Sequence, residues 1–283
     1  MTTDGRVGGP DSGTYGSAAA AEGWRRSAAA RAQHMGPITE RMLDLAGIEP
    51  GHRVLDVAAG TGEQTLMAAR RVGPNGFVLA TDIADQMLAY LSEAAQEAGL
   101  ANVETRVLDA RQLDLEPDSF DAAICRSALM LIPERDKALA GIRRALRPGK
   151  KLAVIVMPTA EKLSHTAASL DIARRHAGLP PAPFEDPGMF ALGDPRVLRA
   201  TFEQAGFRDV AVETAATEQR FPSMAAAMKQ RRNTLPEMEP FLAGLSDAER
   251  AAVWDEIEEF MRRFETADGV VVPHERLLGV GTK

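Results

Sequence analysis

The run from residue 54 to residue 64, VLDVAAGTGEQ, restricts the fold of this chain more than any other stretch. Residues 54–57 form an apolar run with the length of a buried strand, and a helix is expected over residues 64–71. Small residues fill the turn between them, so a ligand above the turn can touch backbone N–H groups at the start of the helix. The run therefore predicts a strand–turn–helix unit with a ligand site at the end of its strand.

Strand-like and helical segments alternate after this unit. The expected strands are residues 77–81, 103–108, 120–125 and 152–157, and the expected helices include residues 84–98 and 136–146. This alternation predicts a doubly wound α/β fold with a mostly parallel sheet and right-handed crossovers. Its ligand is expected at the carboxyl ends of the strands, where the strand order reverses.

Acidic side chains outnumber basic ones, 40 to 33, among the 283 residues, which gives a formal charge of −7. This balance disfavours nucleic acid and anionic membranes as partners. The single cysteine, Cys125, excludes an intramolecular disulfide and fits a reducing compartment. The sequence contains no apolar run of transmembrane length. We therefore expect a cytoplasmic protein without a membrane partner.

Acidic residues follow three successive strands of the expected sheet. Asp56 lies at the carboxyl end of the first strand. Its negative charge there would stabilise a cationic group of a ligand but not a phosphate. Asp82 lies about 20 residues past the glycine turn, where a carboxylate can accept the hydroxyls of a ribose. Asp109, with Ala110, can face an adenine edge. A helix-starting aspartate and a solvated turn are the plain alternatives for Asp82 and Asp109.

The run D-V-A-x-G-T-G resembles the first motif of the class I S-adenosylmethionine-dependent methyltransferases and is similar to that of the quinone-pathway C-methyltransferases. The resemblance implies a Rossmann-like methyltransferase fold, S-adenosylmethionine as the cofactor and a small-molecule methyl acceptor. Ala58 stands where many members have glycine, and the segment after the fourth strand, 125–129, does not look like the quinone subfamily. The cofactor-binding residues that the resemblance implies are Asp56, Ala58, Ala59, Gly60, Thr61, Gly62, Asp82, Ile83, Met87, Asp109, Ala110 and Arg126.

The domain organisation follows from this resemblance and from changes in composition. Strands from residues 208–216 and 276–282 are expected to form an antiparallel pair that completes a seven-stranded sheet. Two helices, 22–33 and 37–45, would carry Trp24, which is either a lid residue over the cofactor or a helix anchor. The expected parts are a disordered tail (1–21), N-terminal helices (22–48), a cofactor-binding core (49–157), a lid segment (158–193) and a C-terminal part (194–283) with a helical insertion (219–265).

Methyl transfer from a sulfonium needs alignment and exclusion of water more than it needs a catalytic group. His34 is the candidate base, with a surface histidine as its alternative, and His165, His176 and His274 are weaker candidates. No metal site is expected. The wall residues favour a small, mainly apolar acceptor, and the basic segment 229–232 is interpreted as a solvated helix face. The expected wall residues are Leu129, Met130, Leu163, Phe184, Met189, Phe190, Met224 and Met228.

Two other functions compete with a methyltransferase. A nicotinamide (NAD or NADP) oxidoreductase uses the same architecture, but Thr65 stands where its fingerprint needs glycine or alanine, and Asp56 has no use there. A non-catalytic S-adenosylmethionine-binding partner subunit is the third possibility, because the catalytic requirement is so slight. The intact motifs and the large apolar lid favour an enzyme.

Overall fold

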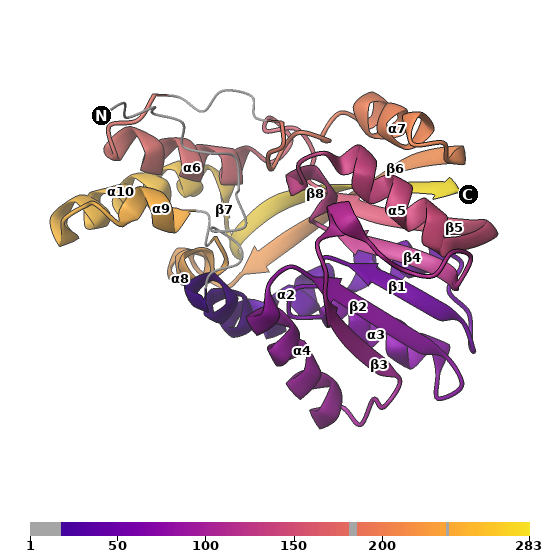
Figure 1. Cartoon of the computed structure of the whole chain (residues 1–283). Coiled ribbons are helices and arrows are strands. Elements are labelled where there is room, and N and C mark those ends of the chain that lie inside the picture. Colours follow the sequence, from indigo (N-terminus) through magenta and orange to yellow (C-terminus); the bar gives the residue numbers. More distant parts are fainter. Residues whose placement is uncertain (1–17, 181–185, 236–237) are drawn as a thin grey trace, which may run out of the picture.

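One twisted sheet runs through the computed structural model, which describes residues 18–180, 186–235 and 238–283 (Figure 1). Its parallel strands are β1 (Arg53–Val57), β2 (Phe77–Asp82), β3 (Val103–Val107), β4 (Phe120–Arg126) and β5 (Leu146–Val156). Its antiparallel strands are β6 (Arg208–Phe221), the two-residue β7 (Glu265–Thr266) and β8 (Gly269–Thr282). The doubly wound, mostly parallel fold expected from the sequence is confirmed.

The strand order is β3-β2-β1-β4-β5-β8-β6, and β7 pairs with β8 off this path. The seven strands of the path match the expected number, and β7 is an addition to it. The order reverses between β1 and β4. From β1 the chain proceeds through β2 and β3 to one edge of the sheet, and from β4 it proceeds through β5 toward the other edge. A crevice at the carboxyl ends of these two strands is where a doubly wound sheet binds its ligand.

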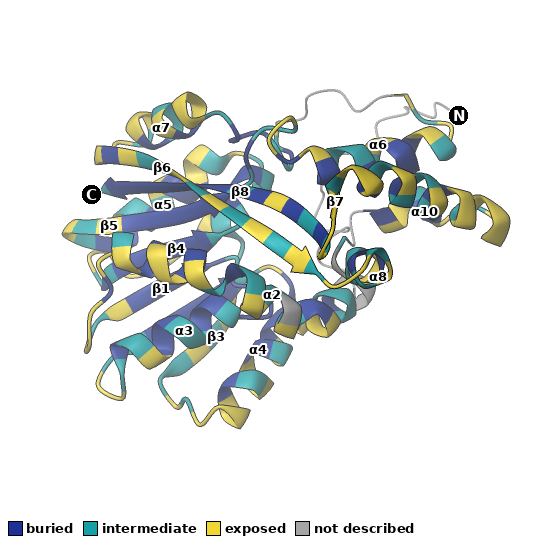
Figure 2. Cartoon of the chain, turned by 180° about the vertical axis from the view of Figure 1, so that it is seen from behind, coloured by how far each residue is buried: buried dark blue, intermediate teal, exposed yellow. Residues whose placement is uncertain are grey.

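Helices cover both faces of the parallel part of the sheet. On one face lie α2 (Ala18–Leu45), α3 (Glu63–Val72) and α4 (Asp85–Glu97), and on the other lie α5 (Arg135–Ala145) and α7 (Pro195–Gln204). The alternation of side chains along β1 explains this division, because Leu55 and Val57 pack toward α5 while Val54 packs toward α2 and α3. The central strands are accordingly buried on both faces (Figure 2).

A separate apolar cluster holds the helices beyond the end of the sheet together. These helices are α6 (Ser164–His176), α8 (Met224–Thr234), α9 (Glu239–Leu242) and α10 (Asp247–Met261), seen together on the left of Figure 1. Val270 and Val272 of β8 join the cluster, so the end of a sheet strand anchors this helical layer. The expected capping box is present, with Ser246 accepting from the backbone N–H of Glu249. In the parts of the chain that are described, no helix has the length and apolarity needed to cross a membrane.

Two boundaries near the N-terminus differ from expectation. The expected helices 22–33 and 37–45 are one helix, α2, with Pro37 inside it. Pro37 removes one intrahelical hydrogen bond, but Met35, Ile38 and Met42 pack the helix on the sheet on both sides of it. The helix begins at Ala18, within the expected tail, and Ala21 is buried against α4. Residues 1–17 of that tail lie outside the described residues.

The C-terminal strands are longer than expected. β6 continues to Phe221, so residues 219–221 belong to the sheet and not to the helical insertion. β8 runs without a break through Pro273, so it begins before residue 276, where the expected strand started. The segment around Pro273 pairs with β6, whereas β5 pairs only with the later part from Leu277 onward. Proline is tolerated because that part of β8 has neighbouring strand on one side only.

We predict that Gly62→Ala destabilises the protein strongly. Gly62 has a φ of 83°, and an added Cβ would lie 2.0 Å from Cδ1 of Leu91 on α4. The left-handed backbone and the overpacking together should lower the free energy of unfolding by about 3 kcal/mol. Chemical denaturation measures this value. Gly99→Ala is the matched control, because Gly99 has a similar φ of 67° and open space around it. Equal losses in the two variants would show that the contact with Leu91 is unimportant.

Candidate functional site

A cavity of about 400 Å³ opens at the carboxyl ends of β1, β2, β3 and β4. It lies at the reversal of strand order and is roofed by side chains from α2, α6, α8 and β8. Its volume falls in the range of small-molecule sites. The sequence-predicted residues that line it are Trp24, His34, Ala58, Ala59, Gly60, Thr61, Met87, Asp82, Ile83, Asp109, Ala110 and Arg126. Asp56 and Gly62 do not line it.

Strained backbone marks the two strand ends that flank the reversal. Ala58 after β1 has a φ of 55°, and Ser127 after β4 has a φ of 59°. A non-glycine residue in this conformation costs on the order of 1 kcal/mol, and such strain concentrates at functional sites. Gly60 has a φ of 57° and nothing within 4 Å of the place where a Cβ would stand. The turn thus offers its backbone directly to the cavity.

Asp82 is fixed by two backbone N–H groups. Its Oδ2 accepts from Gly60 at 2.8 Å, and its Oδ1 accepts from Ala84 at 2.9 Å. Burial nevertheless raises the pKa of Asp82, because these hydrogen bonds do not fully replace water. Ile83 beside it is 46% exposed and lines the cavity.

Asp109 and Arg126 reach the cavity with their charged groups already engaged. Asp109 accepts hydrogen bonds from Nε and Nη2 of Arg111, which lower its pKa, and one from the backbone N–H of Arg111. Arg126 is paired with Glu63 and donates to Oγ1 of Thr39 at 3.2 Å. Trp24 both lines the cavity and packs against Met87, and its buried Nε1 has no hydrogen-bond partner in the part of the chain that is described.

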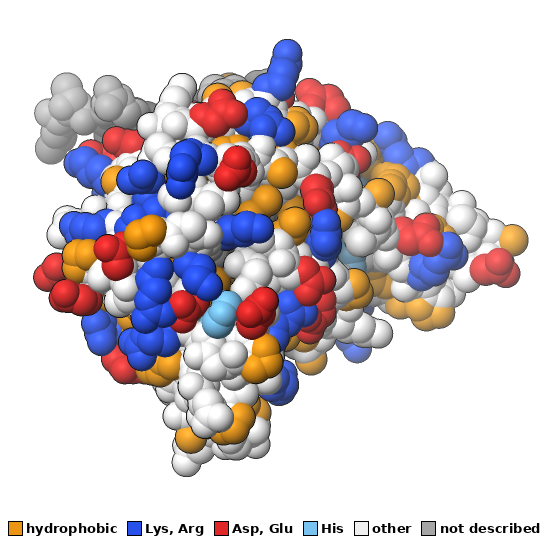
Figure 3. All heavy atoms as spheres, turned by 90° about the vertical axis from the view of Figure 1, so that its right-hand side faces the viewer, with side chains coloured by type: hydrophobic (Ala, Val, Ile, Leu, Met, Phe, Trp, Pro, Cys, Tyr) orange, Lys and Arg blue, Asp and Glu red, His pale blue; other side chains and the backbone are white. Residues whose placement is uncertain are grey.

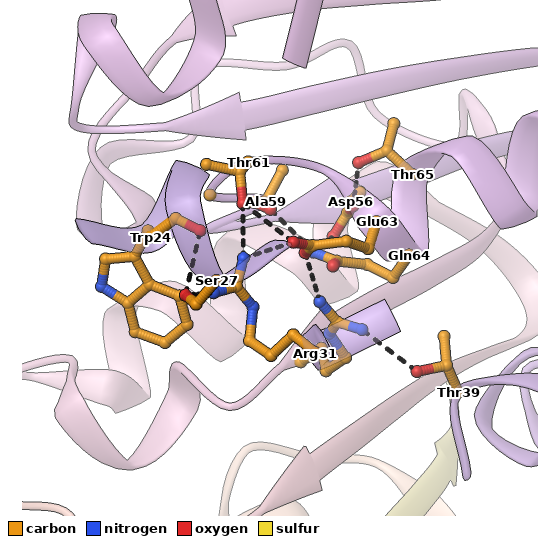
Figure 4. A network of polar contacts seen from close by, with 12 residues as sticks. Trp24, Ser27, Arg31, Thr39, Asp56, Ala59, Thr61, Glu63, Gln64 and Thr65 are labelled. Carbon is orange, nitrogen blue, oxygen red and sulfur yellow. Dashed lines mark hydrogen bonds and ion pairs between the residues drawn. The ribbon is translucent and has the colours of Figure 1, made fainter. Parts of the chain in front are cut away.

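Asp56 points away from the cavity, which corrects its expected contact with a ligand. It shares the strand face of Val54, on which α3 packs, and its side chain is fully buried. Its Oδ2 accepts from Oγ1 of Thr65 at 2.5 Å, and Nε2 of Gln64 lies 3.4 Å from its Oδ1 (Figure 4). Burial raises the pKa of Asp56 to about 7. Gly62 likewise acts in packing, against Leu91.

Glu63, which sequence reasoning missed, is the central acidic group of the site. Its carboxylate is paired with Arg31 of α2 through one oxygen and with Arg126 of β4 through the other, at 2.7 Å. Arg31 also donates to Oγ1 of Thr61 at 2.8 Å and stacks on the ring of Trp24 (Figure 4). Burial opposes ionisation of Glu63, but the two guanidinium groups outweigh it and lower the pKa. This network fastens α2 across the turn after β1.

Three histidines meet on the roof side of the same cavity. The ring of His274 lies 4.5 Å from that of His34 and 4.9 Å from that of His165. Burial, followed by the charges of nearby arginines, lowers the pKa of His34 to about 4 and of His165 to about 3, so both rings are neutral at neutral pH. Across the described residues, no group of three or more His, Cys, Asp or Glu side chains is placed to hold a metal ion.

The walls are less uniformly apolar than expected. Leu163 and Met189 line the cavity, whereas Leu129, Met130 and Met228 are buried in the cores. Phe190 and Met224 lie outside the lining, and Phe184 lies outside the described residues. Arg231, assigned from sequence to a solvated helix face, and Arg276 both line the cavity. Buried positions alternate in β8 from Val270 to Arg276, and a strand period of two, applied from Val270 and Val272, is the sequence signal that could have revealed Arg276.

The sheet is a Rossmann-like α/β sheet, with its cavity at the reversal of strand order. A model of the methyltransferase domain family matches residues 48–176. The ubiquinone/menaquinone biosynthesis C-methyltransferase UbiE of Teredinibacter turnerae is 39% identical over 114 residues, which are 40% of this chain and 46% of that protein. The chain thus spans less than half the length of the curated relatives that it matches. The matched segment is similar to the class I S-adenosylmethionine-dependent methyltransferases.

Solved structures agree on the fold across most of the chain. Phosphoethanolamine N-methyltransferase 2 of Haemonchus contortus has a TM-score of 0.59 at 19% identity, over 96% of this chain and 58% of that one. The cyclase SpnF has a TM-score of 0.55 at 21% identity, over 87% of this chain and 80% of that one. At these identities the likeness concerns the fold alone, and one such fold serves different reactions.

We predict that Asp56→Asn changes how stability depends on pH. The folded pKa of about 7 exceeds the ordinary value of 3.8, so the unfolded chain releases this proton first as pH rises. Between pH 4 and 7 the wild type should therefore lose stability relative to the variant, by up to about 4 kcal/mol. Denaturation at several pH values measures this difference. Asp114→Asn, at an exposed position, should follow the wild type. A difference that does not vary with pH would contradict the raised pKa.

Proposed function

We propose that this protein transfers the methyl group of S-adenosylmethionine to a small molecule enclosed in the cavity. The observation that carries the proposal is the convergence of the glycine turn, Asp82 with Ile83 and Asp109 with Ala110 on one cavity at the reversal of strand order. The family match of residues 48–176 supports it independently.

The residues present fit such a cofactor. The backbone at Gly60 is open to the cavity, Asp82 can accept from ribose hydroxyls, and Ile83 offers an exposed aliphatic surface to a base. The buried Nε1 of Trp24 is a donor that still needs an acceptor. Asp56 and Gly62 would stabilise the turn through their hydrogen bonds and packing. The proposed cofactor-binding residues are Trp24, Ala58, Ala59, Gly60, Thr61, Asp82, Ile83, Met87, Asp109, Ala110 and Arg126.

When bound, the sulfonium supplies a methyl group that is already activated for transfer. The chain then has to hold the acceptor in line and exclude water. We infer that α2, the segment 158–193 and the helices within 219–265 act as the lid, because their side chains roof the cavity. His34 lines the cavity, but a pKa of about 4 makes it a weak base, so alignment outweighs proton removal by the protein.

The competing functions have less support. Asp82 and Asp109 could also face a nicotinamide dinucleotide, but the relatives reported above are methyltransferases. The net charge of −7 and the mixture of basic and acidic side chains on the face in Figure 3 support a small-molecule acceptor rather than nucleic acid. A place in the cytoplasm remains part of the proposal. A cofactor-binding subunit without catalysis would bind S-adenosylhomocysteine but methylate nothing in an acceptor screen.

Asp82→Asn should weaken binding of S-adenosylhomocysteine without unfolding the protein. Loss of the charged acceptor is expected to cost about 2 kcal/mol, on the order of thirtyfold in Kd. Calorimetry measures the change, with Asp85→Asn as the control, because Asp85 is exposed on the next helical turn and does not line the cavity. Tight binding of NADH by the wild type without any response to S-adenosylhomocysteine would refute the proposed function.

His34→Ala should reduce turnover by less than about a hundredfold, the lower end of the effect of a general base. The assay uses whichever acceptor a radiolabelled methyl-transfer screen identifies, and the affinity for S-adenosylhomocysteine is measured in parallel. His176→Ala is the control, because His176 pairs with Glu256 outside the cavity. A loss of several orders of magnitude with unchanged cofactor affinity would instead make His34 a required base.

A further inference from the structure

Two arginines on the roof side of the cavity have no carboxylate partner among the described residues. Arg276 belongs to β8 and is 6% exposed, and Arg231 belongs to α8 and is partly buried. Both line the cavity together with His34, His165 and His274. We call these five residues the arginine–histidine cluster.

The backbone of β8 dictates how the cluster faces the cavity. Successive side chains of a strand alternate, so Val272, His274 and Arg276 share one face, and all three line the cavity. Arg276 donates from Nη1 to the carbonyl of Glu275 at 2.8 Å. Its Nη2 lies 2.9 Å from Nε2 of His274, and since Arg276 can only donate, Nε2 accepts. The proton of the neutral His274 ring is therefore on Nδ1.

Two hydrogen-bond donors of the cluster have no acceptor in the described part of the chain. Nδ1 of His274 and Nε of Arg276 are buried and form no hydrogen bond among the described residues. Buried donors without partners are rare and costly in native proteins. Both belong to residues that line a cavity large enough for a ligand, so a bound acceptor group would satisfy them.

The positive charge of the cluster also lacks an acidic partner among the described residues. Within the described residues, no carboxylate lies within 4.0 Å of the guanidinium of Arg231 or Arg276. The three acidic residues that line the described part of the cavity interact with other groups. Glu63 pairs with Arg31 and Arg126. Asp109 pairs with Arg111, and Asp82 accepts hydrogen bonds from backbone N–H groups. Burial lowers the pKa of each arginine to about 10, which leaves both charged at neutral pH. A buried charge without a partner is strongly destabilising unless a counter-ion binds beside it.

We propose that the arginine–histidine cluster binds an anionic group, a carboxylate or a phosphate, of the methyl acceptor. This inference rests on the proposed function. The guanidinium fork matches both anions, and the unpaired N–H of His274 adds a third donor. Met157, Leu163 and Met261 line the cavity nearby and suit an apolar body. The proposed acceptor is thus an amphipathic acid, a more polar molecule than the mainly apolar one expected from the sequence.

The cluster is separate from the turn that faces the cofactor. His34 follows Arg31 by three residues on α2, about one helical turn. Arg31 contacts Thr61 of the turn, and His34 contacts His274 of the cluster. One helix therefore spans from the proposed cofactor end to the proposed anion end.

Calorimetry on protein saturated with S-adenosylhomocysteine tests the proposal. The probes are 2-naphthoate, 2-naphthyl phosphate and the uncharged 2-naphthamide, together with their single-ring counterparts benzoate, phenyl phosphate and benzamide. We expect one charged probe to bind roughly tenfold or more tightly than its amide, the effect of one charge-assisted hydrogen bond. The tighter anion identifies the group as carboxylate or phosphate.

Arg276→Gln and Arg231→Gln should each abolish this preference while leaving the affinity for S-adenosylhomocysteine unchanged. Arg231, on the outer helix, provides the test if the buried Arg276 variant does not fold. Arg232→Gln is the matched control, because Arg232 is the next residue of the same helix but is exposed, over the ring of Trp254.

Three results would overturn the proposal. The amides could bind as tightly as the anions, or no charged probe could bind at millimolar concentration. Alternatively, Arg276→Gln could weaken S-adenosylhomocysteine itself, which would assign the cluster to the carboxylate of the cofactor. Failure of the proposed function is distinguishable from all three, because the wild type would then either not bind S-adenosylhomocysteine or methylate no acceptor in the screen.

Discussion

The buried carboxylate of Glu63, held between Arg31 and Arg126, is the interaction on which the site depends. It joins three elements that are far apart in sequence, namely α2, the turn after β1 and the end of β4. Removing one member of such a network leaves a buried charge without a partner, which costs several kcal/mol. Because α2 also carries Trp24 and His34, the same carboxylate that shapes the turn fixes two walls of the cavity.

The charges of the cavity are divided between its two ends. Acidic side chains follow β1, β2 and β3, whereas two arginines that have no carboxylate partner among the described residues belong to β8 and α8. At the first end, Arg31 and Arg126 surround Glu63, and Arg111 pairs with Asp109, so guanidinium groups already balance most of the acidic charge. An anionic acceptor is favoured at the other end, where the field of the two arginines would orient it before any side chain takes part in chemistry. This fits a reaction whose main requirement is alignment.

The sequence predicted the parts of the structure that local patterns determine. The strand–turn–helix unit, the alternation of strands and helices, and the positions of Asp82 and Asp109 at strand ends follow from spacing within a few dozen residues. Which way Asp56 points depends on the face of β1 that α3 covers, and both faces of that strand are buried. Glu63 gains its importance from partners 32 and 63 residues away. Arg231 and Arg276 lie at one cavity only because tertiary packing brings α8 and β8 together. From the sequence alone, the basic segment 229–232 was therefore interpreted as a solvated helix face.

A crystal structure of the complex with S-adenosylhomocysteine tests the central claim most directly. We predict the ribose on the carboxylate of Asp82, the adenine beside Ile83 and Asp109, and the sulfur directed toward His34 and the arginine–histidine cluster. The rest of the cavity, between the sulfur and Arg276, should remain free for an acceptor. A ligand bound outside the cavity, or one with its adenine among Arg231 and Arg276, would contradict the proposed arrangement of donor and acceptor.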